Sequence, residues 1–210
     1  MHVRTKVCGI TRLEDLRNVL DAGADAIGLV FYPKSKRCVD LELAAELVAA
    51  VPAFVTVTGL FVDEMPENIQ KILDVLPLDL LQFHGNESPA YCQQFRKPYI
   101  KAVRVQAGMD LVQYATNFKG ARGLLLDAFV DGVPGGTGHT FDWSLIPGQL
   151  SLPLILSGGL NPLNVTEAIQ AVKPYAVDVS SGVEVRPGVK DAQKIQDFIK
   201  GVRNAELPAA

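Results

Sequence analysis

The 210-residue chain lacks the features that define several large classes of protein. It has three cysteines, Cys8, Cys38 and Cys92, and no Cys-x-x-Cys pair, so neither a zinc knuckle nor a dithiol redox centre is indicated. No apolar run is long enough to span a bilayer, and the first residues do not resemble a signal peptide. These absences predict a cytoplasmic protein without a metal site.

The chain also lacks an excess of positive charge. Twenty Lys and Arg residues against 23 Asp and Glu residues give a net charge of −3 at pH 7, and no basic run is present. Neither a nucleic acid nor an anionic membrane is therefore expected as a partner, and a small molecule is favoured. No sequence feature sets an oligomeric state. A bound phosphate would have to be held locally, by backbone amides and a few side chains.

What the chain does contain is a regular alternation of short apolar runs and amphipathic stretches. An amphipathic stretch follows each run, so eight helices are expected, including one around residues 141–146 and a last one over Val189–Arg203. A capping box at Thr11-Arg12-Leu13-Glu14 predicts the start of the first helix. The eight predicted strands are Thr5–Cys8, Asp25–Phe31, Phe54–Phe61, Leu80–Phe83, Ile100–Val105, Gly123–Asp127, Leu152–Ser157 and Ala176–Val179.

Strands that are apolar throughout are typical of a parallel sheet covered by helices. Eight strand–helix units predict an α/β protein with a single-domain (β/α)8 barrel, the TIM barrel. Its loops must be short, because the fold usually needs about 250 residues. A doubly wound sheet is the alternative, although it usually has fewer units. We expect the barrel to occupy residues 1–205 and residues 206–210 to form a loose tail.

Two glycine-rich turns in the last third of the chain each follow a predicted strand. Ser157-Gly158-Gly159 follows the seventh strand, and Ser180-Ser181-Gly182 follows the eighth. Strand ends built from small residues leave backbone N–H groups free to bind an anion. In a (β/α)8 barrel these two strand ends commonly form one phosphate site. The turns therefore predict a phosphate ligand and identify the end of the barrel that carries the active site.

Cys8 and Asp127 end the first and sixth predicted strands, so both are expected at this same end. Cys8 could be a small buried hydrophobe, or a base if a neighbouring group lowers its pKa. Asp127 could be a turn residue or helix cap. It could also be a general acid, because the three leucines before it would raise its pKa. A Cys/Asp pair across a substrate suits proton transfer in an isomerisation, which needs no cofactor.

Other polar residues near predicted strand ends are candidates for ligand binding. Arg37, in the loop after the second strand, could hold a carboxylate, or it could simply solvate a loop that also contains two lysines. His84 ends the fourth strand and could be structural. Asp178 could orient a sugar hydroxyl or pair with another residue inside the barrel. The glycine-rich loop around Gly136 could close over a ligand or merely connect two elements.

Taken together, these segments resemble the phosphoribosylanthranilate isomerase family of tryptophan biosynthesis. They follow the order found in the family and run from residue 6 to residue 184, with the first and last segments the most specific. Phe83 stands where many members have an aliphatic residue. The resembling segments are Lys6-Val7-Cys8-Gly9-Ile10-Thr11, Ser35-x-Arg37, Gln82-Phe83-His84-Gly85, Leu126-Asp127, Gly135-Gly136-Thr137-Gly138, Ser157-Gly158-Gly159-Leu160 and Asp178-Val179-Ser180-Ser181-Gly182-Val183-Glu184.

The resemblance implies a cofactor-free Amadori rearrangement of N-(5-phosphoribosyl)anthranilate to 1-(2-carboxyphenylamino)-1-deoxyribulose 5-phosphate. It implies that Asp127 is the general acid for the furanose ring oxygen and that Cys8 is the general base for the C2′ proton. Arg37 would hold the anthranilate carboxylate. The remaining predicted substrate-binding residues, several of them at the phosphate, are His84, Gly136, Gly158, Gly159, Asp178, Ser180, Ser181 and Gly182.

Other functions fit these residues less well. A histidine-pathway isomerase would show two similar halves and a carboxylate on the first strand, where this chain has Cys8. Indole-glycerol-phosphate synthase would need a lysine acid and several glutamates at strand ends. A non-catalytic sensor of phosphate ligands would keep the glycine turns but would not need a Cys/Asp pair. A thiol redox protein would need a second cysteine, such as Cys38, to pair with Cys8.

Overall fold

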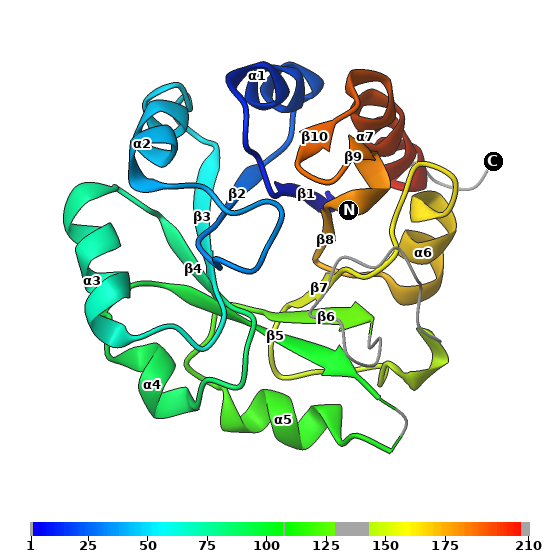
Figure 1. Ribbon diagram of the computed structural model, residues 1–210. Coiled ribbons are helices and arrows are strands. Elements are labelled where there is room, and N and C mark those ends of the chain that lie inside the picture. Colours follow the sequence, from blue (N-terminus) through cyan, green and yellow to red (C-terminus); the bar gives the residue numbers. More distant parts are fainter. Residues whose placement is uncertain (1, 107, 129–142, 207–210) are drawn as a thin grey trace.

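The computed structural model of the chain describes residues 2–106, 108–128 and 143–206. Eight parallel strands form a closed barrel in the order of the sequence, and helices surround it (Figure 1). The last strand pairs with the first, with Lys6 opposite Asp178, and this pairing closes the barrel. The predicted (β/α)8 barrel is therefore confirmed, and the doubly wound alternative is excluded because such a sheet stays open.

The observed strands lie within two residues of the predicted ones, because each is a short apolar run bounded by turn residues. They are β1 (Arg4–Cys8), β2 (Ala26–Val30), β3 (Thr56–Phe61), β4 (Leu80–Phe83), β5 (Tyr99–Val105), β6 (Leu124–Ala128), β7 (Leu154–Leu156) and β8 (Ala176–Val179).

The helices begin and end at residues whose chemistry explains their bounds. Gly23 ends the first helix in the left-handed conformation (φ 87°), and the Asp40 side chain caps the second by accepting the Leu43 N–H. Pro66 and Pro89 occupy first helical positions, where no N–H is needed. The helices are α1 (Leu13–Ala22), α2 (Leu41–Ala49), α3 (Pro66–Val75), α4 (Pro89–Gln93), α5 (Leu111–Asn117), α6 (Val165–Val172) and α7 (Ala192–Glu206).

The segment between β6 and β7 departs from the prediction. The expected helix around residues 141–146 is wrong: the structure has a single 3-10 turn, η1 (Trp143–Leu145), and residues 129–142 lie outside the described residues. Three residues bounded by Pro147 and Gly148 are too few for an α-helix.

The segment after β8 also differs. A 3-10 turn, η2 (Ser181–Val183), leads into an antiparallel hairpin of β9 (Glu184–Arg186) and β10 (Val189–Lys190). The predicted helix start at Val189 is therefore wrong, because the Pro187-Gly188 turn, with Gly188 at φ 83°, places Val189 in a strand. At the other end, α7 continues to Glu206, which was predicted to belong to a loose tail, and residues 207–210 lie outside the described residues.

The predicted capping box at Thr11 is wrong as well. Arg12 is the N-cap of α1 and makes no side-chain cap hydrogen bond. The Thr11 hydroxyl instead donates to the carbonyl of Gly188 in the hairpin. The hydroxyl thus ties the loop after β1 to the hairpin after β8.

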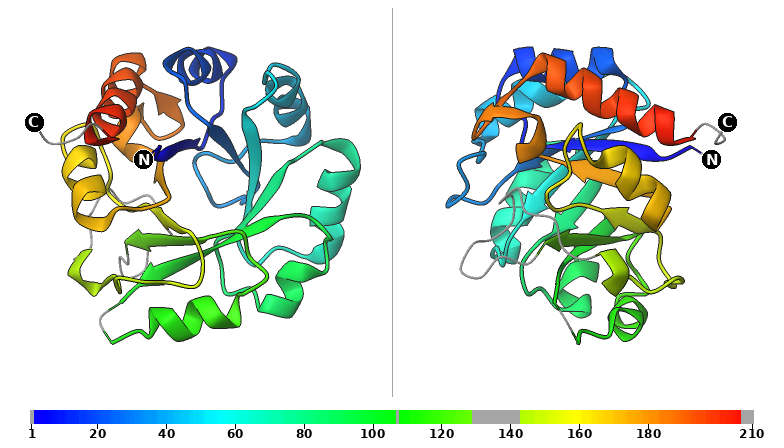
Figure 2. Two further views of the ribbon diagram at one scale, coloured as in Figure 1. Left: turned by 180° about the vertical axis from the view of Figure 1, so that it is seen from behind. Right: turned by 90° about the vertical axis from the view of Figure 1, so that its right-hand side faces the viewer.

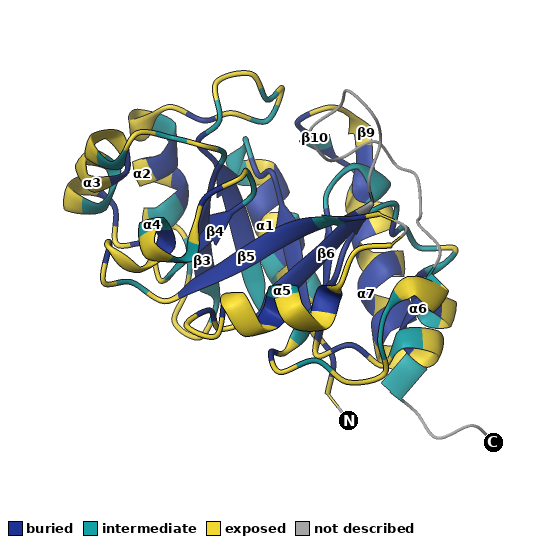
Figure 3. Cartoon of the chain, turned by 90° about the horizontal axis from the view of Figure 1, so that it is seen from below, coloured by how far each residue is buried: buried dark blue, intermediate teal, exposed yellow. Residues whose placement is uncertain are grey.

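The core has three parts, and their positions show at which end of the barrel a ligand can enter. Large apolar side chains such as Phe61, Phe83 and Phe198 fill the space between the strands and the helices, whose outer faces are exposed (Figure 3). A separate cluster plugs the barrel interior and consists of Ile100, Ala102, Leu125, Ile155 and Ala176. These five residues stand in the first half or the middle of their strands. The third cluster, Cys8, Val30 and Leu60, stands at or next to the C-terminal ends of its strands and lines a cavity, so the open end of the barrel is the C-terminal end.

The two ends of the described chain meet at the other end of the barrel. The N–H of Val3 donates to Glu206 Oε1 at 2.6 Å. Figure 2 (right) shows the end of α7 and the start of β1 on the same side of the molecule. The last helix is therefore fastened to the first strand.

Candidate active site

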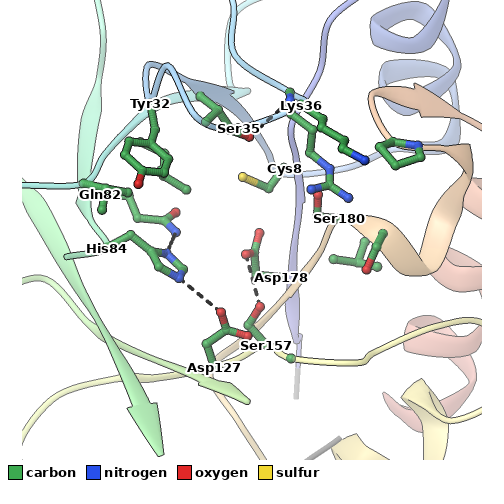
Figure 4. Close-up of a pocket in the computed structure, with 18 of the residues that line it drawn as sticks. Cys8, Tyr32, Ser35, Lys36, Gln82, His84, Asp127, Ser157, Asp178 and Ser180 are labelled. Carbon is green, nitrogen blue, oxygen red and sulfur yellow. Dashed lines mark hydrogen bonds and ion pairs between the residues drawn. The ribbon is translucent and has the colours of Figure 1, made fainter. Parts of the chain in front are cut away.

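A cavity of about 380 Å³ opens at the C-terminal end of the barrel (Figure 4). Its walls come from strand ends far apart in the sequence, including those of β1, β4, β6, β7 and β8. Gly182 lies in η2 beside it without lining it, and Gly136 lies outside the described residues. The predicted site residues that line the cavity are Cys8, Arg37, His84, Asp127, Gly158, Gly159, Asp178, Ser180 and Ser181.

Cys8 ends β1, and its thiol occupies space left open by the neighbouring strand. A Cβ atom at Gly28 of β2 would lie 2.7 Å from Cys8 Sγ, so a glycine is needed opposite the thiol. Burial raises the pKa of the Cys8 thiol above its ordinary value, although the positive charges of Lys6 and Lys190 lower it in part. The thiol is therefore protonated at neutral pH until a base or a bound ligand changes its surroundings.

Lys6 and Asp178 form a buried ion pair next to this thiol. Lys6 Nζ donates to Asp178 Oδ1 at 2.8 Å, and Ser157 Oγ lies 3.4 Å from Asp178 Oδ2. Both charged side chains are less than one-tenth exposed. Of the two roles considered for Asp178, pairing inside the barrel is thus present in the structure, and its lining of the cavity leaves it within reach of a ligand.

Asp127 at the end of β6 is hydrogen-bonded to His84. His84 Nε2 lies 3.1 Å from Asp127 Oδ2, and His84 Nδ1 lies 2.9 Å from Gln82 Nε2 (Figure 4). Because the Gln82 amide nitrogen can only donate, Nδ1 accepts and Nε2 carries the proton that it donates to Asp127 Oδ2. His84 therefore orients Asp127 towards the cavity.

Gln82 is a cavity residue that reasoning from the sequence missed. Its side chain is fully buried, and its Oε1 atom has no hydrogen-bond partner within the described part of the chain. Its position two residues before His84 on β4 was the available signal, because alternate residues of a strand share one face.

The turns after β7 and β8, the candidate anion cradle, both line the cavity. Gly158 and Gly159 both have positive φ angles (80° and 68°), which turn successive N–H groups in one direction. The N–H groups of Gly158, Gly159 and Ser181 donate no hydrogen bond to any other described residue. Gly182 brings the two turns together, since a Cβ atom there would lie 1.9 Å from the Leu160 carbonyl oxygen. The cradle thus offers unused donors from two turns.

Arg37 borders the cavity, but one edge of its guanidinium group is already hydrogen-bonded to another residue. Its Nε and Nη2 atoms each donate to a carboxylate oxygen of Glu184, both at 2.7 Å. Its stem crosses Gly9, where a Cβ atom would lie 2.5 Å from Arg37 Cδ. The hydrogen bonds to Glu184 raise the pKa of Arg37 further, so it stays charged. The sequence predicted Arg37 but not Glu184, although Glu184 ended the last resembling segment.

The described residues form neither a candidate metal site nor a membrane-spanning helix. No group of three or more His, Cys, Asp or Glu side chains there could hold a metal ion. The helices described there include none with the length and apolar character needed to cross a membrane. All three cysteines are free, so the disulfide between Cys8 and Cys38 that a redox protein would need is not formed.

Comparison with known proteins agrees with the geometry of the cavity. Residues 5–201 match the model of the family described as N-(5'phosphoribosyl)anthranilate (PRA) isomerase. The chain is 58% identical to N-(5'-phosphoribosyl)anthranilate isomerase of Azotobacter vinelandii over 203 residues, which is 97% of this chain and 98% of the relative.

Two solved structures are similar over nearly the whole chain. The phosphoribosyl anthranilate isomerase of Thermotoga maritima is 45% identical, with a TM-score of 0.89 and coverage of 96% of this chain and 99% of that one. A phosphoribosyl anthranilate isomerase in complex with reduced 1-(o-carboxyphenylamino)-1-deoxyribulose 5-phosphate is 44% identical, with a TM-score of 0.85 and the same coverage.

Proposed function

Because the chain belongs to the N-(5'-phosphoribosyl)anthranilate isomerase family, whose members act in tryptophan biosynthesis, we propose that Cys8 and Asp127 catalyse the Amadori rearrangement of this substrate. The reaction converts an aldose into a ketose. The observation that carries the proposal is that a thiol, a carboxyl group and an unused amide cradle share one cavity. The proposed substrate has the matching parts, a ribose between a phosphate and an anthranilate carboxylate.

The first step opens the furanose ring. Asp127 in its protonated form gives a proton to the ring oxygen while the bond between C1′ and that oxygen breaks. The lone pair of the anthranilate nitrogen forms a double bond to C1′, which gives a protonated Schiff base. His84, hydrogen-bonded to Asp127, holds the carboxyl group in the orientation that proton transfer needs.

The second step moves a proton from C2′. Cys8 as a thiolate removes this proton, and the electron pair of the C–H bond neutralises the Schiff base to give an enolamine. The enolamine gains a proton at C1′ and loses one from the C2′ hydroxyl, which yields the ketone. Carbon C2′ is oxidised and C1′ is reduced by equal amounts, so the reaction needs no external redox cofactor.

Binding energy is proposed to come from the two ends of the substrate. The N–H groups of Gly158, Gly159, Ser181 and Gly182 bind the phosphate, together with the loop that contains Gly136. Arg37 binds the anthranilate carboxylate. The related structure that holds the reduced product, a phosphosugar with a carboxyphenylamino group, supports a substrate of this kind.

Turnover of freshly generated substrate tests the proposal. Anthranilate and phosphoribosyl pyrophosphate are coupled by a phosphoribosyltransferase, and the loss of the intermediate's fluorescence is followed after the chain is added. We expect Cys8→Ala and Asp127→Asn each to lower kcat by about 10²–10⁴-fold while the fold is retained. Cys38→Ala is the matched control and should keep full activity, because Cys38 is exposed and does not line the cavity.

The outcome separates the roles of the residues. Near-normal turnover in either cavity variant would remove that residue from the mechanism. Binding of the substrate without any turnover by the unmodified chain would contradict catalysis and favour a sensor of phosphate ligands.

The cytoplasm is the compartment that we propose for this reaction. The three free cysteines support it, because thiols persist in a reducing environment. Fractionation of cells that express the full chain, with the isomerase assay applied to each fraction, tests this assignment.

A further inference from the structure

Behind Arg37 lies a buried ion pair that the proposed mechanism does not use. Lys190 Nζ lies 2.9 Å from Glu184 Oε1, and the two side chains are 0% and 4% exposed. Neither residue lines the cavity, so neither is placed to touch a ligand directly. Any influence on the ligand must therefore pass through the groups that they hold.

Lys190 holds the ends of the two strands that close the barrel. Its Nζ atom donates to the carbonyl oxygen of Cys8 at 2.6 Å and to that of Ser180 at 3.0 Å. With Glu184 these make three acceptors that carry no hydrogen of their own, so Nζ must supply three hydrogens and is an ammonium group. Burial lowers the pKa of Lys190, but these hydrogen bonds and the charge of Glu184 favour the ammonium form.

Glu184 in turn fixes the direction of the Arg37 guanidinium. It accepts from Nε and Nη2, a bidentate arrangement that leaves one rotational position for the planar group. Nη1 makes no hydrogen bond within the described residues, and the Arg37 side chain is 16% exposed at the cavity. Gly9 also restricts the aliphatic part of the Arg37 side chain, because this part packs directly against the Gly9 backbone.

The charges of the three side chains do not cancel. Arg37 and Lys190 are positive and Glu184 is negative, so this buried corner carries a net charge of about +1. A single carboxylate that arrives at Arg37 would bring the total to zero. The three side chains are thus arranged to bind one monoanionic group, which would approach Arg37 from the cavity.

We propose that Glu184 and Lys190 are positioning residues for recognition of the substrate carboxylate: Glu184 aims Arg37, and Lys190 anchors Glu184 to the strand ends that carry Cys8 and Ser180. This inference rests on the proposed function, which assigns Arg37 to the anthranilate carboxylate. Two other roles of Glu184 would give different results. If Glu184 only competed for Arg37, its removal would strengthen carboxylate binding. If it only stabilised the fold, its removal would affect every ligand equally.

The experiment compares two ligands by titration calorimetry. One is reduced 1-(2-carboxyphenylamino)-1-deoxyribulose 5-phosphate, and the other is the same compound without the carboxylate. The ratio of their affinities, the carboxylate selectivity, cancels effects on the phosphate site. In Glu184→Gln we expect this ratio to fall at least tenfold, because the amide cannot accept both N–H groups of Arg37. Glu184→Asp keeps the charge but has a shorter side chain, so it should lower the ratio as well. Lys190→Met should lower the ratio by at least fivefold.

Glu87→Gln is the matched control. Glu87 is another buried carboxylate paired with a buried lysine, Lys101, at 3.0 Å, and it is not in contact with Arg37. It should lower thermal stability without changing the ratio. An unchanged or increased ratio in Glu184→Gln and Glu184→Asp would overturn the inference.

A failure of the proposed function would give a different result from a failure of the positioning role. If the unmodified chain binds both ligands equally, Arg37 does not recognise the carboxylate, and the assignment beneath the inference is wrong. If it prefers the carboxylated ligand and every variant keeps that preference, the positioning role alone is wrong.

Discussion

At the scale of single residues, the proposed role of Cys8 as a base depends on the protonation state of its thiol. Burial raises its pKa, so at neutral pH the reactive thiolate is the minor form in the free enzyme. Its fraction grows as the pH rises towards that pKa. We therefore expect the rate at which iodoacetamide alkylates Cys8 to increase about tenfold per pH unit between pH 7 and pH 9. Mass spectrometry of the Cys8 peptide over a pH series checks this, and a flat profile over that range would rule out a thiolate formed in the free chain.

Gly9 offers a second test at this scale. It has φ +79°, and a Cβ atom there would collide with the stem of Arg37. Gly9→Ala should therefore displace the guanidinium and raise KM about tenfold, in addition to the cost of about 1–2 kcal/mol for the left-handed backbone. Gly108→Ala is the matched control, since Gly108 has φ +83° and nothing lies within 4 Å of its Cβ position. Equal KM values for the two variants would show that contact with Arg37 is unimportant.

Individual cavity residues were predictable where they end a strand. Cys8 and Asp127 are polar residues directly after apolar runs, and parallel strands bring such positions to one face. Glu184 and Lys190 could not be found in this way, because they act from a hairpin whose two short strands have no periodic pattern. The contact of Arg37 with Glu184 depends on a pairing across 147 positions, which no local signal contains.

The hairpin of β9 and β10 is the main surprise at the scale of elements. Thr11 was predicted to cap α1 but donates its hydroxyl to Gly188 in this hairpin. Thr11→Val, which keeps the shape, should cost about 1 kcal/mol of stability. Hydrogen exchange should become faster in the amides of residues 184–190 and stay unchanged in the first turn of α1. Faster exchange in α1 alone would restore the capping role.

Elements with a clear pattern and strong end signals were predicted well. β4 and β8 have the predicted bounds, and a side-chain cap at Asp40 begins α2. Two of the failures, the helix around residues 141–146 and the helix start at Val189, lie next to Pro-Gly pairs at 147–148 and 187–188. Pro-Gly pairs favour turns and end helices and strands, so both pairs were signals against the helical residues predicted beside them.

At the scale of the whole molecule, Glu206 fastens the last helix to the first strand. It accepts the Val3 N–H at 2.6 Å. Glu206→Ala should cost about 1–2 kcal/mol and lower Tm by about 2–8 °C, because a backbone donor loses a charged partner. Glu206→Gln keeps an acceptor oxygen and should lose less than half of that. Thermal unfolding measures both, and identical Tm values for the variants and the unmodified chain would show that the contact adds nothing.

The closure between β1 and β8 has a consequence for the synthesis of the protein. Cys8 leaves the ribosome early, yet Lys190, which binds its carbonyl oxygen, is made 182 residues later. Asp178, the partner of Lys6, follows after 172 residues. A chain that stops before residue 190 therefore lacks the group that joins the ends of β1 and β8, and we expect it to have no isomerase activity. In a host without an isomerase of its own, growth without added tryptophan would then require a chain translated through residue 190 and a closed barrel.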